Sequence, residues 1–227
     1  MVRAITFDAF GTVIDEGDAL IGIARDICAD HRPSLRPEAL LATWDRYLFS
    51  IAESERFMTL AKLTEESLGK AFRDFRIDAE PRPYVDSLGS LGSQAAAYPE
   101  VPGVLKALDG VPRAIVSDAD DAFLTGILKR NRLRFDAVIT SESVRAYKPH
   151  PQIFEAALKA LRANPAEVVH VGDSLAEDIA GASRLGIRTI WVNRGEVRRT
   201  PTDPKPDAEV RDLASLPDVF EQVVART

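Results

Sequence analysis

The sequence predicts an α/β fold in which a doubly wound parallel sheet carries an inserted bundle of helices. From about residue 99 onward, short β-branched segments alternate with segments of helical periodicity, which is typical of parallel βαβ units. From residue 18 to about residue 91 the apolar residues recur only at helical spacing. We therefore expect one core formed by residues 1–14 and 99–227, and a helical domain formed by residues 15–98.

The first strand is expected at the N-terminus. Val2 to Phe7 is mostly apolar with β-branched members, as in a short buried strand. This segment leads into Asp8. Gly11 then lets the chain turn sharply and leaves room for a ligand near the backbone. Ligands of α/β folds bind in the crevice beyond the carboxyl ends of the strands, so Asp8 is predicted to lie in such a crevice.

Four helices are expected in the insert. Apolar residues recur at helical spacing over residues 19–28 and 37–52, and Pro37 suits the first turn of the second helix. Thr64 is expected to cap a third helix that extends to Phe75. A fourth helix is expected to follow Pro83 and to end near residues 89–92.

The rest of the chain is expected to complete a Rossmann-like core. Strands are predicted at residues 113–117, 137–140, 168–172 and 187–192. Helices are predicted at residues 101–108, 121–130, 151–161, 175–185 and 217–225. Proline at the start of two of these helices and Gly186 after a third fit their expected ends. Residues 201–206 are expected to form a proline-rich loop.

Composition excludes several classes of protein. The 227 residues carry a formal net charge of −6 and show no basic stripe, which argues against nucleic-acid binding. No apolar run approaches the roughly 20 residues of a membrane span, and the chain enters a strand without a signal peptide. The single cysteine, Cys28, cannot form an internal disulfide, so a cytoplasmic protein is expected. Both a monomer and a homodimer remain open.

Polar side chains follow several predicted strands. Asp8 follows the first, Ser117 ends the second, and Asp173 and Asp178 follow the fourth, while Lys148 lies in the loop after the third. Parallel strand ends share one edge of a sheet, so these groups can meet. Carboxylate oxygens are ligands that Mg²⁺ prefers, and an aspartate can act as a nucleophile that forms a covalent ester. A lysine would offset the negative charge, and a serine would donate a hydrogen bond to a substrate oxygen.

These segments resemble a known family. Asp8–Thr12, Ser117–Asp118, Lys148–Pro149 and Gly172–Asp178 are similar to the four motifs of the haloacid dehalogenase superfamily, and the helical insert resembles that superfamily's cap. The resemblance covers essentially the whole chain. It implies Asp8 as the nucleophile and Ser117 and Lys148 as further catalytic residues. It also implies an Mg²⁺ site formed by Asp8, the backbone carbonyl of Phe10, Asp173 and Asp178.

The subgroup within the superfamily is ambiguous. Its phosphatases carry a second aspartate two residues after the nucleophile, for proton transfer, where this chain has Phe10. An aromatic residue there resembles the 2-haloacid dehalogenases, whose halide leaves without a proton. The dehalogenases, however, carry arginine directly after the cap tryptophan, where this chain has Asp45 and then Arg46. Their fourth motif has serine and asparagine where this chain has Asp173 and Leu175.

The favoured interpretation of the sequence is an Mg²⁺-dependent hydrolase that acts through Asp8 on a small phosphorylated metabolite. The alternatives are a metal-independent 2-haloacid dehalogenase, and a catalytically degenerate member that only binds a ligand or partner. The side chains or backbone expected to contact a small-molecule substrate are those of Phe10, Gly11, Thr12, Asp118 and Arg46. Asp118 is equally consistent with capping of the following helix. Further candidates for substrate contact are Tyr47, Arg56 and Arg194.

Overall fold

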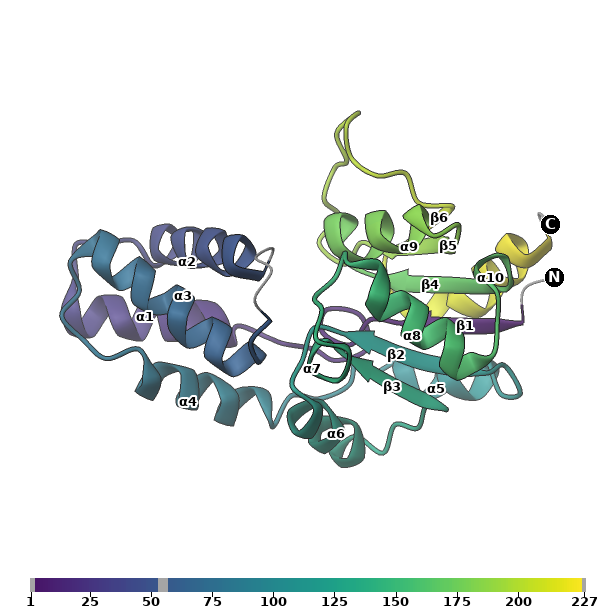
Figure 1. Cartoon of the computed structure of the whole chain (residues 1–227), viewed down its shortest axis with the longest axis horizontal. Coiled ribbons are helices and arrows are strands. Elements are labelled where there is room, and N and C mark those ends of the chain that lie inside the picture. The colour runs from purple at the N-terminus through teal and green to yellow at the C-terminus, as the bar shows by residue number, and fades with distance from the viewer. Residues whose placement is uncertain (1–2, 53–56, 226–227) are drawn as a thin grey trace.

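The computed structural model describes residues 3–52 and 57–225. Its sheet and surrounding helices form one body, and four helices form a separate bundle connected to that body by two linkers (Figure 1). This arrangement confirms the predicted fold class. Val2, which was assigned to the first strand, lies outside the described residues.

The sheet has six strands, and every neighbouring pair is parallel. The strands are β1 (Ala4–Phe7), β2 (Arg113–Ser117), β3 (Ala137–Thr140), β4 (Val168–Gly172), β5 (Arg188–Val192) and β6 (Ala208–Val210). Their order is β3-β2-β1-β4-β5-β6, so the order reverses at β1, as in doubly wound folds. Phe7 pairs with Ile115 and Val171, which places Asp8 just beyond the centre of the sheet.

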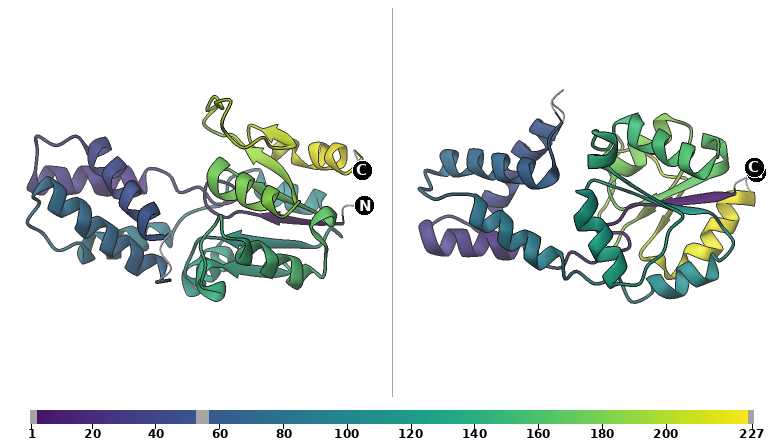
Figure 2. Two further views of the ribbon diagram at one scale, coloured as in Figure 1. Left: turned by 45° about the horizontal axis from the view of Figure 1, so that its top comes forward. Right: turned by 60° about the horizontal axis from the view of Figure 1, so that its bottom comes forward.

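Helices cover both faces of this sheet (Figure 2). One face packs against α5 (Val101–Ala107), α6 (Asp121–Arg130) and α10 (Leu216–Ala225). The other packs against α8 (Pro151–Leu161) and α9 (Ala180–Arg184). Shorter elements complete the core: α7 (Ser141–Val144), η1 (Pro165–Glu167), η2 (Leu175–Ile179) and η3 (Leu213–Ser215).

The bundle has its own apolar core. It comprises α1 (Ala19–His31), α2 (Pro37–Ala52), α3 (Leu60–Phe75) and α4 (Arg82–Gly92). Apolar side chains from all four helices form one cluster that includes the buried Trp44. The indole Nε1–H of Trp44 donates a hydrogen bond to Ser67 Oγ at 3.0 Å, so this buried polar atom has a partner, as burial requires.

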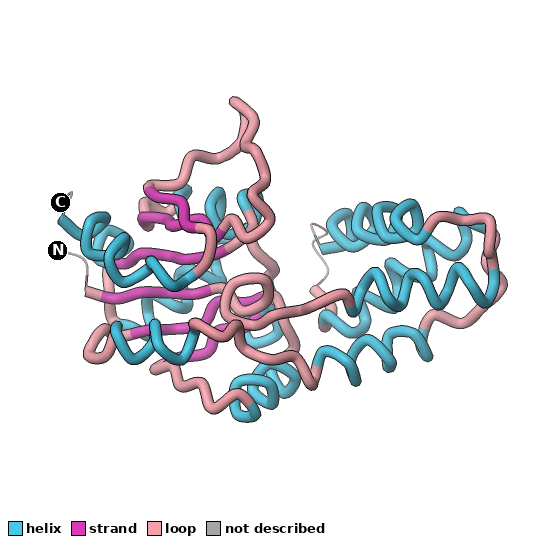
Figure 3. The backbone as a smooth tube through the Cα atoms, turned by 180° about the vertical axis from the view of Figure 1, so that it is seen from behind, coloured by secondary structure: helices cyan, strands magenta, loops and turns pink. Residues whose placement is uncertain are grey.

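The two linkers run side by side between the bundle and the sheet (Figure 3). Ile14 bridges to Ala97 in antiparallel fashion, and the Asp15 N–H donates to the Ala96 carbonyl at 2.8 Å. These contacts tie the start of the bundle to its end. No helix in the described part of the chain has both the length and the apolar character needed to cross a bilayer.

The structure differs from the expected elements in three places. Helix α3 begins at Leu60 and not at Thr64, whose hydroxyl donates to the Leu60 carbonyl within the first turn. Residues 175–179 form a single wide π-helical turn before α9, where one continuous α-helix was expected. Strand β6 was not expected, because three residues give too short a pattern to recognise.

Candidate active site

A cavity of about 490 Å³ lies between the carboxyl edge of the sheet and the bundle. The core contributes Asp8, Ser117 and Lys148 to its wall, and the bundle contributes Trp44 and Leu48 among others. The strand ends therefore supply the polar side chains, as expected for the crevice of a doubly wound sheet.

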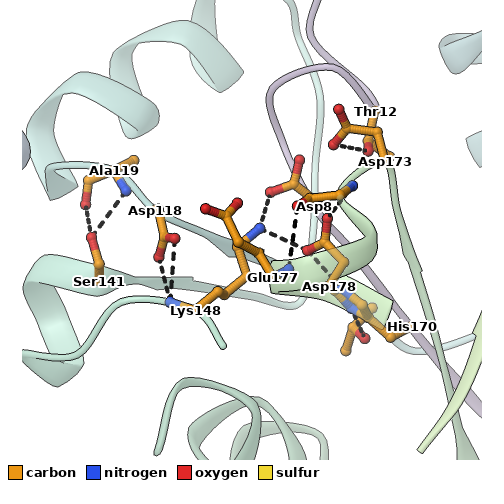
Figure 4. Close-up of polar contacts among 12 residues, drawn as sticks. Asp8, Thr12, Asp118, Ala119, Ser141, Lys148, His170, Asp173, Glu177 and Asp178 are labelled. Atoms are coloured by element: carbon orange, nitrogen blue, oxygen red, sulfur yellow. Dashed lines mark hydrogen bonds and ion pairs between the residues drawn. The ribbon is translucent and has the colours of Figure 1, made fainter. Parts of the chain in front are cut away.

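Lys148 connects Asp8, which lines this cavity, to Asp178, which is fully buried behind the cavity wall (Figure 4). Its ammonium donates to Asp8 Oδ1 at 2.6 Å and to Asp178 Oδ1 at 2.7 Å. All three side chains are buried, with at most 6% of any of them exposed. Two acids and one ammonium buried together leave one negative charge without a balancing cation, and buried charges are costly unless they are paired.

The pKa values of these groups separate their roles. Burial raises the pKa of Asp178, but Lys148 and His170 outweigh burial, so the pKa of this carboxyl lies below its usual range. Burial lowers the pKa of the Lys148 ammonium, but Asp178 and Asp8 outweigh it and raise that pKa. Burial raises the pKa of Asp8 well above its usual range despite the attraction of Lys148. Asp178 and Lys148 therefore form the charged pair, and Asp8 is the acid that binds a proton more readily.

Asp178 is held by donors from three directions. Lys148 and the ring nitrogen Nε2 of His170 contact Oδ1, the latter at 3.1 Å, and the Ser174 N–H donates to Oδ2 at 3.0 Å. His170 Nδ1 lies 2.9 Å from Thr6 Oγ1. Burial lowers the pKa of the His170 ring. The neutral ring therefore has one N–H, and the arrangement is satisfied when Nε2 donates to Asp178 and the Thr6 hydroxyl donates to Nδ1.

The loop after Asp8 is packed against Asp173. Gly11 has a φ of +78°, and a Cβ at this position would collide with the Asp173 carboxylate, so glycine meets both requirements. The Thr12 hydroxyl donates to Asp173 Oδ1 at 3.4 Å. Arg194 donates to the backbone carbonyls of Gly11 and Thr12 at 3.1 and 2.8 Å. Arg194 thus holds the loop through its backbone carbonyls and does not line the cavity.

Ser117 is the last residue of β2, and Asp118 follows it, on the other side of β1 from β4. The Ser117 hydroxyl is buried, lines the cavity and has no hydrogen-bond partner. The Asp118 carboxylate accepts the Lys148 backbone N–H at 3.0 and 3.2 Å. Burial, which outweighs the attraction of Lys148, raises the pKa of Asp118 to about 6. Asp118 therefore anchors the segment that carries Lys148, a role that was not expected for it.

The remainder of the cavity wall is apolar. Phe10 stacks on Phe123 with ring centroids 6.1 Å apart, and both rings line the cavity. Leu48 and Leu88 line it from the bundle. Phe10 has no proton to give, so the position two residues after Asp8 provides a hydrophobic surface and no acid–base group.

Comparison with known proteins identifies the family. The model of the family described as "Hydrolase: haloacid dehalogenase-like hydrolase" matches residues 2–186. The chain belongs to the haloacid dehalogenase-like hydrolases. This confirms the resemblance found in the four motifs.

The similar proteins within this family are mainly dehalogenases. The chain is 33% identical to (S)-2-haloacid dehalogenase 1 of Pseudomonas sp. (strain CBS-3) over 226 residues, which is 96% of each chain. The L-2-haloacid dehalogenase of Xanthobacter autotrophicus shares the fold, with a TM-score of 0.80 over 98% of this chain and 99% of that one at 22% identity. A glyceraldehyde 3-phosphate phosphatase of Pyrococcus furiosus is 31% identical over 159 residues, 65% of this chain and 66% of the phosphatase.

The predicted Mg²⁺ cofactor is wrong. Asp8, Asp173 and Asp178 do place one ligand atom each within 4.8 Å of one another. However, the (S)-2-haloacid dehalogenases to which this haloacid dehalogenase-like hydrolase is similar need no metal cofactor. The Lys148 ammonium already contacts Asp8 and Asp178. A fixed cation of the chain itself therefore occupies the position between these two acids, and neither they nor the Phe10 carbonyl is assigned to a metal.

Arg46 is not brought to the cavity. Its side chain is 67% exposed and its guanidinium lies 3.7 Å from the Asp74 carboxylate, to which Tyr47 donates a hydrogen bond at 2.7 Å. The arrangement therefore does not bring Arg46 or Tyr47 to the cavity, where both were expected to contact the substrate. Arg56 lies outside the described residues.

Four acids that line the cavity were not recognised as part of it from the sequence. Glu16 lies in the first linker, Asp45 in α2 and Glu177 in η2. Asp120 accepts hydrogen bonds from the N–H groups of Leu60 and Ala61 at 2.6 and 3.1 Å, so a core residue caps helix α3 of the bundle. No local signal in the sequence placed these acids at the cavity, and the hydrogen-bond partners of Asp120 lie about 60 residues away.

Proposed function

We propose that this haloacid dehalogenase-like hydrolase cleaves the carbon–halogen bond of a short 2-halo compound, with Asp8 as the nucleophile and without a metal. The observation that carries the proposal is the pairing of Asp8 with Lys148 at 2.6 Å beside an apolar surface at Phe10. The 33% identity over 96% of an (S)-2-haloacid dehalogenase supports it. In this proposal residues 15–98 act as the cap over a core of residues 1–14 and 99–227.

In the first step, Asp8 Oδ2 attacks the carbon that carries the halogen. The carbon–oxygen bond forms as the carbon–halogen bond breaks, and the halide leaves with the bonding electrons. Lys148 holds Oδ1 and so leaves Oδ2 as the attacking atom. A halide needs no proton to leave, so Phe10 is compatible with this step, whereas a phosphate ester would lose the roughly 10²–10⁴-fold contribution of a general acid.

In the second step, water hydrolyses the ester on Asp8. The water oxygen bonds to Asp8 Cγ, the bond from Cγ to Oδ2 breaks, and Oδ2 leaves with the product as a hydroxyl group. The balance is RX + H₂O → ROH + H⁺ + X⁻. Ser117, whose hydroxyl is buried without a partner, is proposed to donate to the substrate. Asp118, which lines the cavity, is proposed to shape the wall around it, and Gly11 and Thr12 are proposed to act indirectly by packing against Asp173.

The test is halide release from a panel of short 2-chloro acids and their amides, in the presence of excess chelator. We expect Asp8-dependent release that the chelator does not reduce, with Asp8→Asn as the inactive control. Phosphate release from short phosphate esters that exceeds halide release would move the assignment to phosphatases, as named for the Pyrococcus furiosus relative. If neither panel shows Asp8-dependent turnover, the remaining interpretation is a catalytically degenerate protein that only binds a ligand or partner.

A further inference from the structure

The polar end of the cavity is rich in carboxyl groups. Besides Asp8, the carboxyl-bearing residues that line it are Glu16, Asp45, Asp118, Asp120, Asp173 and Glu177. They come from the linker, the bundle and two loops of the core, so the acidic character belongs to the whole cavity and not to one segment.

Cations do not balance these acids. Of the described residues that line the cavity, Lys148 is the one with a lysine or arginine side chain. Its ammonium already donates hydrogen bonds to Asp8 and Asp178. Arg194 is bonded to backbone carbonyls and to Glu100 at 2.8 Å, and Arg46 faces Asp74 outside the cavity. Burial raises the pKa of the Asp173 and Glu177 carboxyls to about 7 and that of Asp118 to about 6. Above neutral pH a bound carboxylate would therefore face several like charges and no available cation, which opposes its binding.

An uncharged group, in contrast, finds a suitable partner. The Ser117 hydroxyl is 1% exposed, has no hydrogen-bond partner and lines the same cavity. A hydroxyl can donate and accept at once. It can therefore bind the carbonyl or N–H of a neutral substrate, while the carboxylates beside it can accept N–H groups.

We propose that the substrate carries no negative charge: a short organohalide with a neutral or cationic polar group, such as a 2-halo amide, next to the reacting carbon. This inference rests on the proposed function and names its substrate class. Charge selection of this kind is achieved mainly by like-charge repulsion of the rejected substrate.

The experiment compares 2-chloropropionamide with 2-chloropropionate, which have nearly the same shape and differ in charge. The kcat/KM for halide release from each is divided by the rate at which free acetate displaces the same halide, because the two compounds differ in intrinsic reactivity. Because the pKa values of Asp173 and Glu177 are raised to about 7, the comparison is made above about pH 8, where these carboxyls are charged. We expect the corrected kcat/KM there to favour the amide by about tenfold or more.

Variants test whether the preference for the amide arises from the carboxylates of the cavity. In Asp45→Asn and Glu177→Gln the acid-to-amide ratio of kcat/KM is expected to rise at least severalfold, because each removes one facing charge. Asp86→Asn, a matched change of charge on the exposed side of α4, should leave the ratio unchanged.

The outcomes separate this inference from the proposed function. Halide release that favours the acid after correction, or a ratio that neither cavity variant moves, overturns the inference and leaves the dehalogenase proposal intact. Absence of Asp8-dependent halide release from both compounds overturns the two together.

Discussion

The ammonium of Lys148 lies 2.6 Å from Oδ1 of Asp8, although the two residues are separated by 140 positions in the chain. The same ammonium lies 2.7 Å from Asp178 Oδ1. The loop after β3 thus delivers one cation to the ends of β1 and β4.

Removing the cation should affect folding as well as activity. Lys148→Met leaves Asp8 and Asp178 buried without their ammonium, and loss of one partner of a buried ion pair costs about 3–5 kcal/mol. We expect the free energy of unfolding in urea at pH 7 to fall by about that amount. Part of it should return at pH 5, because the acids then take up a proton. Lys205→Met, at an exposed position, is the control, and equal urea midpoints for the two variants would contradict the account.

His170 should hold Asp178 through a single tautomer. His170→Leu keeps most of the buried volume but leaves the Thr6 hydroxyl and one Asp178 lone pair without partners, at a cost of about 1–3 kcal/mol. His170→Gln, whose amide can replace the Nε2–H donor, should recover part of that loss. Because burial lowers the pKa of His170, NMR of the ring nitrogens in the wild type should show a neutral ring with the proton on Nε2 at about pH 7. A ring that is fully protonated at that pH would rule out this role.

Asp118 should make stability decrease as the pH rises. Burial raises its pKa to about 6 in the folded chain, against about 3.9 for an unfolded aspartate. The folded state therefore binds the proton more tightly, and the free energy of unfolding falls as pH rises from about 4 to 6. Asp118→Asn, which still offers an oxygen to the Lys148 N–H, should gain on the order of 2 kcal/mol relative to wild type between pH 4 and pH 7. Urea unfolding at both pH values measures the difference, and a constant difference would refute the assignment.

Asp120 should stabilise the contact between the bundle and the core. It accepts N–H groups from Leu60 and Ala61 at the start of α3, and loss of a helix cap costs about 0.5–2 kcal/mol. In Asp120→Ala we expect faster hydrogen exchange at these two amides, while amides of β1 in the core exchange as in the wild type. Asp120→Asn, which retains acceptor oxygen, should be intermediate. Unchanged exchange at both amides in the alanine variant would show that the cap is not formed in solution.

The alternation of apolar strands and helices was sufficient to predict the fold. The carboxyl edge of a parallel sheet also predicted that Asp8, Lys148 and Asp178 would meet, because topology alone brings these strand ends together. The fold and the meeting of these three residues both followed from the local sequence pattern, without knowledge of side-chain packing.

The orientation of α2 could not be predicted in the same way. Trp44 is buried in the bundle, so Asp45 turns toward the cavity and Arg46, about 200° around the helix from Trp44, faces solvent. Which of these faces the core depends on how the bundle is placed, and no local signal states it. The metal prediction failed for a related reason. Lys148 was expected near these acids to offset their charge, but its ammonium's direct contact with both Asp8 and Asp178 became evident only in three dimensions.

The most direct test of the central claim, that Asp8 is the nucleophile, is a single-turnover reaction in H₂¹⁸O with enzyme in excess over 2-chloropropionamide or 2-chloropropionate. If an ester on Asp8 is hydrolysed at Cγ, the peptide that contains Asp8 gains about 2 Da and the first product molecule carries unlabelled oxygen. If water attacks the substrate carbon directly, the label appears in the product and the mass of the Asp8 peptide is unchanged, which would contradict the account.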